Sequence, residues 1–175
     1  MESMSDLMTE IDQTFASCSF TGHRVIKTEH ISRLPNLVYR AIDYAYSHGC
    51  REFLCGGAIG FDTVAAREVI RFRLSHHDVR LVMMLPCVDQ DVRWSPRQRE
   101  AYYHVISSAD EVIYISECYN DYCIKERNRR LAERADLVIA YLSRRDSGAG
   151  QTVAMATRLG KKIYNLYPAL EKEKL

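Results

Sequence analysis

A glycine-rich segment near the middle of the chain carries the residue types best suited to binding chemistry. A short apolar run, 52–55, leads into it, and an alanine-rich stretch with helical periodicity follows at once. Glycines at such a strand-to-helix junction permit positive φ angles and let another group approach the backbone N–H donors. The helix behind them points unpaired amides and the positive end of its dipole at the loop. The segment therefore favours an anion, most simply a phosphate, at Gly56, Gly57, Ala58, Gly60 and Asp62.

Two structural explanations compete with this interpretation. Glycines at a strand-to-helix junction can equally be plain tight turns. The carboxylate of Asp62 also suits a helix N-cap, where it would accept N–H bonds of the first turn. Both alternatives stay open at this point.

A second small-residue segment, 147–152, lies far along the chain and follows the apolar run 136–142. Gly148 and Gly150 can expose backbone donors in the same way. The side chains of Gln151 and Thr152 add polar groups beside them. We expect this segment to act with the first one on a shared ligand.

Amphipathic stretches and apolar runs alternate along the chain, and no Asn-Gly or similar hairpin turn joins two runs. Parallel strands need such helical crossovers, and runs that are apolar throughout suit strands covered on both faces. The pattern predicts a Rossmann-like three-layer α/β/α sandwich with a mainly parallel sheet of about six strands. The strands are expected near 16–21, 52–55, 79–85, 110–115, 136–142 and 162–167. The helices are expected near 31–48, 61–75, 95–107, 123–134 and 152–159.

Polar segments follow each of the first five predicted strands. In an open parallel sheet the ligand crevice lies beyond the carboxyl ends of the strands, where the strand order reverses. The five segments would meet there, although all loops are polar and their likeness can be coincidence. They are 21–24, 56–62, 90–94, 116–122 and 147–152.

The predicted helix 123–134 adds two polar residues to this end of the sheet. Asn128 falls on an apolar stripe, so its amide must be hydrogen-bonded, either to loop backbone or as part of a pocket. Arg127 lies at the edge of that stripe. Its guanidinium can fork onto a phosphate or pair with Glu126, Glu133 or Asp136.

The composition of the chain excludes several classes of function. The chain has 175 residues, with 24 basic and 23 acidic residues and a formal net charge of +1. A protein that coats nucleic acid usually has a basic excess, so nucleic acid is not an expected partner. The six cysteines form no CxxC pair, which favours buried thiols in a reducing cytoplasm, with no metal site. We find no signal peptide and no run of membrane-spanning length.

Residues 17–168 are predicted to form a single domain. An N-terminal extension, 1–16, has Met4, Leu7 or Met8, Ile11 and Phe15 at helical spacing. It is either a helix that docks on the body or on a neighbouring subunit, or a frayed tail. Residues 169–175 are expected to be a charged, solvated tail.

The ordered set of motifs resembles the DUF1273 (YpsA-like) family of the SLOG superfamily, over about 17–167. Members are Rossmann-like and similar to the LOG cytokinin-activating enzymes and the DprA core. The resemblance implies a nucleotide-type ligand whose phosphate lies on the glycine loops after strands two and five, and homo-oligomers are common in such folds. The motifs are Thr21-Gly22-His23-Arg24, 56–62, Gln90 with Arg93-Trp94, Glu126-Arg127-Asn128, Ala135-Asp136 and 147–152.

One departure from the LOG pattern bears on catalysis. LOG enzymes resemble phosphoribohydrolases that use an arginine and a glutamate, the latter just after a Gly-Gly-x-Gly-Thr loop. Here Gly148-Ala149-Gly150-Gln151-Thr152 is followed by Val153-Ala154-Met155-Ala156, with no carboxylate. N-glycosidic cleavage needs a group that stabilises the sugar cation or activates water. Arg127 matches the arginine, and Asp62 is the only substitute carboxylate.

We therefore interpret the chain as a binding protein for a nucleotide or nucleotide derivative. A LOG-like nucleoside 5′-monophosphate phosphoribohydrolase and a DprA-like interaction module are the alternatives. Trp94 or Tyr119 would stack on a base, although Trp94 also suits a core or lid position. The predicted ligand-binding residues are Gly22, His23, Arg24, Gly56, Gly57, Ala58, Gly60, Asp62, Gln90, Trp94, Tyr119, Arg127, Asn128, Gly148, Gly150, Gln151 and Thr152.

Overall fold

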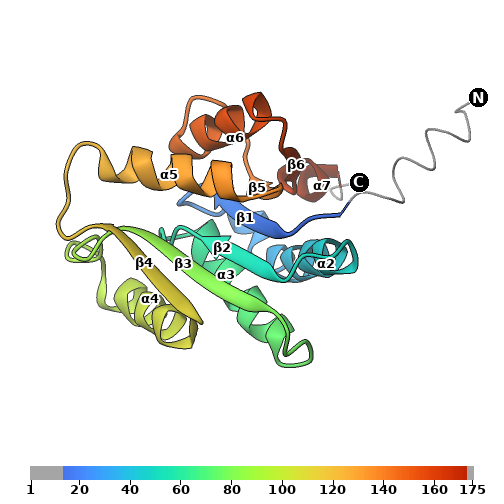
Figure 1. Ribbon diagram of the computed structural model, residues 1–175, viewed down its shortest axis with the longest axis horizontal. Coiled ribbons are helices and arrows are strands. Elements are labelled where there is room, and N and C mark those ends of the chain that lie inside the picture. Colours follow the sequence, from blue (N-terminus) through green and yellow to red (C-terminus); the bar gives the residue numbers. More distant parts are fainter. Residues whose placement is uncertain (1–13, 173–175) are drawn as a thin grey trace, which may run out of the picture.

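Six parallel strands form one sheet in the computed structural model, which describes residues 14–172 (Figure 1). The strand order is β4-β3-β2-β1-β5-β6, and every neighbouring pair is parallel. This confirms the predicted Rossmann-like α/β class. The strands are β1 Ser17–Gly22, β2 Glu52–Cys55, β3 Arg80–Cys87, β4 Glu111–Ser116, β5 Leu137–Tyr141 and β6 Lys162–Asn165.

Helices cover both faces of the sheet. One face carries α2 (Leu34–Ser47), α3 (Phe61–Arg73) and α4 (Pro96–Ser108), and the other carries α5 (Cys123–Arg134) and α6 (Gly148–Arg158). A 3₁₀ turn η1 (Thr28–His30) precedes α2, and α7 (Tyr167–Lys172) ends the described chain.

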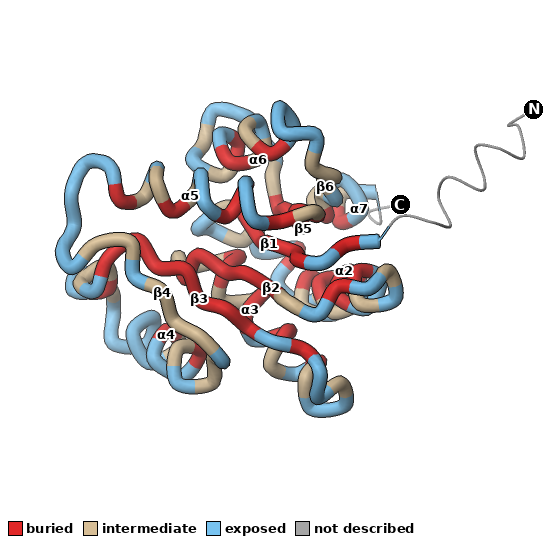
Figure 2. Tube along the Cα trace, viewed as in Figure 1, coloured by how far each residue is buried: buried red, intermediate tan, exposed pale blue. Residues whose placement is uncertain are grey.

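Neighbouring residues of one strand point to opposite faces and so enter different apolar clusters. Phe53 packs in the large core that contains Val38 of α2 and Phe72 of α3. Its neighbour Leu54 packs on the other face with Leu131 of α5. The central strands are accordingly buried over most of their length (Figure 2).

Two expected boundaries are wrong, for identifiable reasons. The third strand, expected near 79–85, continues through Pro86 to Cys87 as β3. The β2 partner of β3 ends at Cys55, opposite Met83, so no neighbour on that side needs a donor from Pro86. The helix predicted from Thr152 begins instead at Gly148, because the side chain of Ser147 forms its N-cap.

The charged tail expected at 169–175 is also corrected as far as Lys172. Those residues continue α7, and Leu170 is buried in the core. Lys27 Nζ binds Glu171 Oε1 at 2.8 Å, and Arg33 Nη2 donates to the Leu170 carbonyl at 2.9 Å. The charged residues of this stretch therefore help to hold α7 against the rest of the domain. The proposed extension 1–16 lies outside the described residues except for its last three.

Cysteine burial follows the prediction with one exception. Five of the six thiols are buried, whereas Cys118 is exposed in the loop between β4 and α5. Among residues 14–172, no helix combines the length and apolar character needed to cross a membrane.

Candidate functional site

A cavity of about 560 Å³ opens at the carboxyl ends of β1 and β5. In the sheet, β2, β3 and β4 lie on one side of β1, whereas β5 and β6 lie on its other side. The strand order therefore reverses between β1 and β5. Parallel sheets bind ligands at such switch points. The lining residues come from β1 and its loop, the β2–α3 loop, α5, and the loop leading into α6.

Arg127 and Asp62 are the buried charges of this cavity, with 5% and 7% of their surfaces exposed. The Arg127 Nη1 group donates to the carbonyl of Gly56, and its Nε donates to Asn128 Oδ1 at 2.8 Å. Asp62 Oδ2 accepts the N–H of Ala58 at 3.0 Å. The two side chains therefore tie α5 and α3 to the loop after β2.

Burial raises the pKa of Asp62 to about 6, although the positive charges of Arg127 and Arg24 and the N–H of Ala58 act in the opposite direction. Burial also lowers the pKa of Arg127; Asp62 opposes this shift, while Arg24 adds to it. The cavity thus holds a carboxyl that titrates near neutrality beside two mutually repelling cations. An anion at the cavity would relieve that repulsion.

The proposed ion pairs of Arg127 with neighbouring acids are wrong. Glu126 and Glu133 bind Arg129, and Asp136 accepts the N–H of Ala16 at 2.7 Å. Arg127 instead points into the molecule, because α5 directs its Cys123–Arg127–Leu131 side toward the sheet. Asn128 fixes that arginine and lines the cavity beside it.

His23 and Arg24 come from the loop after β1. The Ser143 N–H donates to His23 Nε2 at 2.8 Å, so Nε2 is the unprotonated nitrogen of the neutral ring. Burial and the nearby charge of Arg144 lower the pKa of His23. The imidazole therefore fastens the β1 loop to the β5 loop across the cavity, while Arg24 is an exposed part of the lining.

The start of α6 forms another wall of the cavity, through Ser147, Gly148 and Ala149. Ser147 Oγ accepts the N–H of Gly150 at 3.1 Å. The amides of Gly148 and Ala149 belong to the first helical turn, which has no intrahelical acceptors for them. The positive end of the helix therefore faces the cavity.

The glycines after β2 lie where loops pack closely. Gly57 has φ +68°, and an added Cβ would meet Leu85 of the core. Gly60 has φ +81°, and its Cβ would meet the backbone of Arg24. These glycines allow close packing of loops. Of this segment, only Ala58 and Asp62 line the cavity.

Asp62 is not the helix N-cap. Gly60 occupies that position without a side-chain cap, and the carboxylate of Asp62 turns back to Ala58 in the preceding loop. Asp62 differs from an ordinary capping aspartate because it is buried beside Arg127.

Other predicted ligand residues lie outside the cavity lining. Gln90 Nε2 donates to Tyr102 Oη at 2.9 Å, and the ring of Trp94 lies edge-on to Tyr102 at 5.1 Å. Tyr119 is 61% exposed in the β4–α5 loop. Gln151 is exposed on α6, and Thr152 Oγ1 donates to the Gly148 carbonyl at 3.1 Å. The structure brings together Gly22, His23, Arg24, Ala58, Asp62, Arg127, Asn128 and Gly148.

Several residues that line the cavity were not among those predicted from the sequence. Ser143 and Arg144 lie just after Leu142, the first residue beyond β5, whereas the polar segment expected in that loop began only at Ser147. Their place immediately beyond a strand end was the available signal. The other residues missed are Phe20, Thr21, Val25, Ile124, Leu131, Ser147 and Ala149.

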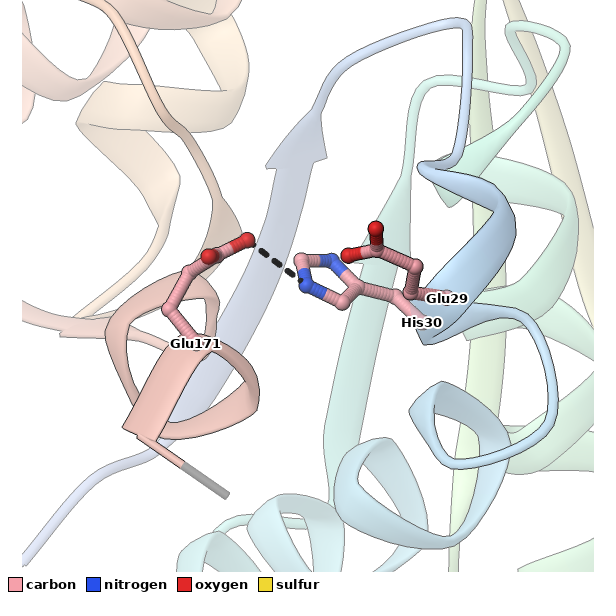
Figure 3. A group of neighbouring side chains, drawn as sticks. All are labelled: Glu29, His30 and Glu171. Atoms are coloured by element: carbon pink, nitrogen blue, oxygen red, sulfur yellow. Dashed lines mark ion pairs between the residues drawn. The ribbon is translucent and has the colours of Figure 1, made fainter. Parts of the chain in front are cut away.

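A separate cluster of Glu29, His30 and Glu171 has possible metal-ligand atoms within 4.8 Å of one another (Figure 3). His30 Nε2 lies 2.9 Å from Glu171 Oε1, and His30 Nδ1 lies 2.7 Å from Tyr141 Oη. Lys27 Nζ lies 2.8 Å from Glu171 and 3.5 Å from Glu29. The lysine already supplies a cation to both carboxylates, so we assign the cluster to fastening α7.

Fold and cavity together define a Rossmann-like protein whose candidate site is at the β1–β5 switch point. The family model described as the YspA SLOG family matches residues 22–167, and the chain belongs to this family.

Among curated relatives, the SPbeta prophage-derived protein YoqJ of Bacillus subtilis is 25% identical over 130 residues, covering 66% of this chain and 76% of YoqJ. A UPF0398 protein of Bacillus cereus is 20% identical over 147 residues, covering 82% and 80% of the two chains.

Two solved structures of DNA processing protein A (DprA) share the fold. The Streptococcus pneumoniae protein has a TM-score of 0.63 at 17% identity, over 86% of this chain and half of that one. The Helicobacter pylori protein, whose structure addresses its single-stranded DNA binding mode, has a TM-score of 0.62 at 17% identity, over 89% and 66%. TM1055 has a TM-score of 0.56 at 15% identity, over 85% and 72%.

Proposed function

We propose that this protein binds a phosphate-bearing nucleotide derivative in the cavity between β1 and β5. The observation that carries the proposal is the meeting of Arg24, Arg127 and the start of α6 with the single buried carboxylate of Asp62. A volume of about 560 Å³ falls within the range of small-molecule sites.

The phosphate would lie against Arg24, Arg144 and the amides of Gly148 and Ala149. Guanidinium groups and a helix start are both favourable to such an anion. Asp62 is mostly ionised at pH 7.5, above its pKa of about 6, so its carboxylate would accept hydrogen bonds from sugar hydroxyls. Trp94 and Tyr119 take no part in this arrangement, because neither lines the cavity.

Isothermal titration against AMP, ADP, ADP-ribose, NAD and inorganic phosphate tests the proposal. We expect sub-millimolar dissociation constants for at least one nucleotide at pH 7.5. Arg144→Gln should weaken binding by about tenfold through loss of a charge-assisted contact. Arg158→Gln, on the exposed far end of α6, is the matched control and should bind as the parent does. Absence of heat and of thermal stabilisation across the panel would refute the proposal.

A nucleoside 5′-monophosphate phosphoribohydrolase is the second candidate. The observation that favours it is the position of Asp62, whose titrating carboxyl lies in the same cavity as Arg127. Such a pair has the composition needed to assist N-glycosidic cleavage. Release of free base from AMP, GMP, CMP or UMP, lost in both Asp62→Asn and Arg127→Ala, would establish it. Binding without base release leaves the first proposal as the function.

Single-stranded DNA is the ligand named for the H. pylori relative of this fold. In this chain Arg129 and Arg130 are engaged by Glu126 and Glu133, which reduces the positive charge that α5 offers to a polyanion. We propose that nucleic acid is not the partner. A gel shift that is abolished by charge reversal at Arg144 and Arg145 would overturn this.

A further inference from the structure

The contact between His23 and Ser143 places a hydroxyl group beside a ring nitrogen within the cavity. Both residues line the cavity, and Ser143 Oγ lies 3.0 Å from His23 Nε2. His23 is half-buried and Ser143 is exposed, so a bound molecule can reach the hydroxyl group. A nucleophile and a base within about 2.6–3.2 Å of one another form the arrangement that covalent catalysis needs.

The backbone of Ser143 holds the ring of His23 in the state of a base. The Ser143 N–H donates to the same Nε2 at 2.8 Å, so the proton of the neutral ring is on Nδ1. Burial and the charge of Arg144 lower the pKa of His23, although Asp146 acts in the opposite direction. The ring is therefore neutral at pH 7.5, and Nε2 can accept the proton of the hydroxyl group. The N–H bond alone is enough to fasten the two loops, so the hydroxyl group is not needed for that purpose.

The loop between β5 and α6 brings this pair close to the expected position of the phosphate. Arg144 follows Ser143 in the cavity lining, and the first turn of α6 belongs to the same lining. Ser147 Oγ donates to the Arg144 carbonyl at 3.2 Å, and a Cβ added at Gly150 would meet the backbone of Arg145. The loop is thus folded tightly against the start of the helix. Guanidinium groups and helix N-termini beside a phosphoryl group stabilise the charge that develops during its transfer.

We propose that Ser143 and His23 form a nucleophile–base pair that transfers the terminal phosphoryl group of a bound nucleotide derivative to Ser143 and then to water. This inference rests on the proposed function, because the phosphate must lie in the cavity between β1 and β5.

The reaction has two steps. In the first, Ser143 Oγ attacks phosphorus while its proton passes to His23 Nε2. The bond between phosphorus and the leaving oxygen breaks, and that oxygen takes the proton from Nε2. In the second, a water molecule gives a proton to Nε2 and attacks the phosphorus of phosphoserine. The bond between phosphorus and Ser143 Oγ breaks, and Oγ takes the proton from Nε2. The net reaction is hydrolysis of one phosphate ester or anhydride bond.

Incubation of the full chain with p-nitrophenyl phosphate and with ADP tests the pair. We expect release of p-nitrophenol and of inorganic phosphate, and acid quenching should trap a phosphoryl group that peptide mass spectrometry locates on Ser143. Ser143→Ala and His23→Gln should each lower the rate by about a hundredfold or more. Ser107→Ala and His77→Gln are the matched controls, exposed and outside the cavity lining, and should keep the rate of the parent.

The pH profile separates catalysis from a purely structural role of His23. In the parent, the rate should fall as the pH drops through the lowered pKa of His23, because the protonated ring accepts no proton from Ser143. The profile of any residual rate in His23→Gln should lack this fall. Ser143→Ala keeps the backbone N–H that binds the ring, so a loss of rate in this variant does not come from loosened loops.

Calorimetric titration of the same parent protein with nucleotides separates this inference from the proposed function. Nucleotide binding without turnover and without phosphoserine would overturn the nucleophile–base pair and leave the binding function. A rate that is unchanged in Ser143→Ala would overturn the pair as well. Turnover of p-nitrophenyl phosphate through Ser143 without nucleotide binding would support the pair and refute the proposed nucleotide ligand.

Discussion

The two glycine-rich segments of this protein look alike in sequence, but their glycines differ in what surrounds them in the fold. After β2, Gly57 and Gly60 bring loops into close packing, and the amides of Ala58 and Phe61 are bound by Asp62 and by the His23 carbonyl. Before α6, Gly148 has open space around it and lines the cavity, whereas a Cβ added at Gly150 would meet the backbone of Arg145. A glycine at a strand end therefore either allows loops to pack closely or leaves the backbone open to a ligand. Only the atoms that an added Cβ would meet distinguish the two roles.

The largest expected effect is on the packed side of this comparison. Gly60→Ala combines a φ of +81° with a clash against the backbone of Arg24, so it should lower the free energy of unfolding by about 3 kcal/mol or more. The midpoint of urea denaturation measures this. Gly160→Ala is the control, since its φ is +74° but its surroundings are empty, and it should cost only about 1 kcal/mol. Equal losses in the two variants would remove the packing argument.

Substitution of Asp62 tests whether the protein keeps a functional charge beside the loop after β2 at the expense of its free energy of unfolding. Its folded pKa of about 6 lies above the unfolded value, so the folded state binds the proton more tightly and loses stability as the pH rises from about 4 to 6. Asp62→Asn should therefore raise the free energy of unfolding at pH 7.5 by up to about 3 kcal/mol, at about 1.4 kcal/mol per pKa unit.

The gain from Asp62→Asn should vanish at pH 4, where the parent side chain is protonated in the folded state. Urea denaturation at pH 4, 5, 6 and 7.5 gives the profile. A variant that is less stable than the parent at every pH would show that the carboxylate is well compensated by Arg127 and Arg24.

In the segment before α6, substitution of the residue that caps the helix should have a moderate effect on stability. Ser147→Ala removes the acceptor for the Gly150 N–H and should cost about 1 kcal/mol in unfolding free energy. Ser147→Asn keeps a capping oxygen and should retain most of the stability. If the alanine variant matched the asparagine variant, the start of α6 would owe nothing to this cap.

The smallest effect is expected at Gly148. An added Cβ meets nothing within 4 Å, and the residue is helical with no positive φ. Gly148→Ala should therefore be neutral or raise the free energy of unfolding by about 0.5 kcal/mol, by restricting the unfolded chain. A loss above about 1 kcal/mol in urea denaturation would place this glycine with Gly60.

Periodicity predicted the sheet and the main helices, because apolar runs and stripes report burial directly. In the helix expected near 31–48, the regularly spaced apolar residues Leu34, Val38, Ala41, Ile42 and Ala45 are buried on α2. Ile31 is 57% exposed, since α2 starts only at Leu34, with a proline in its first turn. Polar roles were harder to predict. Arg127 was expected at the edge of an apolar stripe, to bind phosphate or pair with a nearby acid, but its side chain is buried and donates to the Gly56 carbonyl, 71 residues away in the chain.

The neighbouring strands β1 and β5 are also separated by most of the chain, with Cys18 opposite Leu137. During synthesis β2, β3 and β4 emerge soon after β1 and can pair in turn on one of its sides. The other side of β1 must wait for more than one hundred further residues. Until β5 is synthesised, one edge of β1 has no strand to pair with, and such an unpaired edge can pair with other chains.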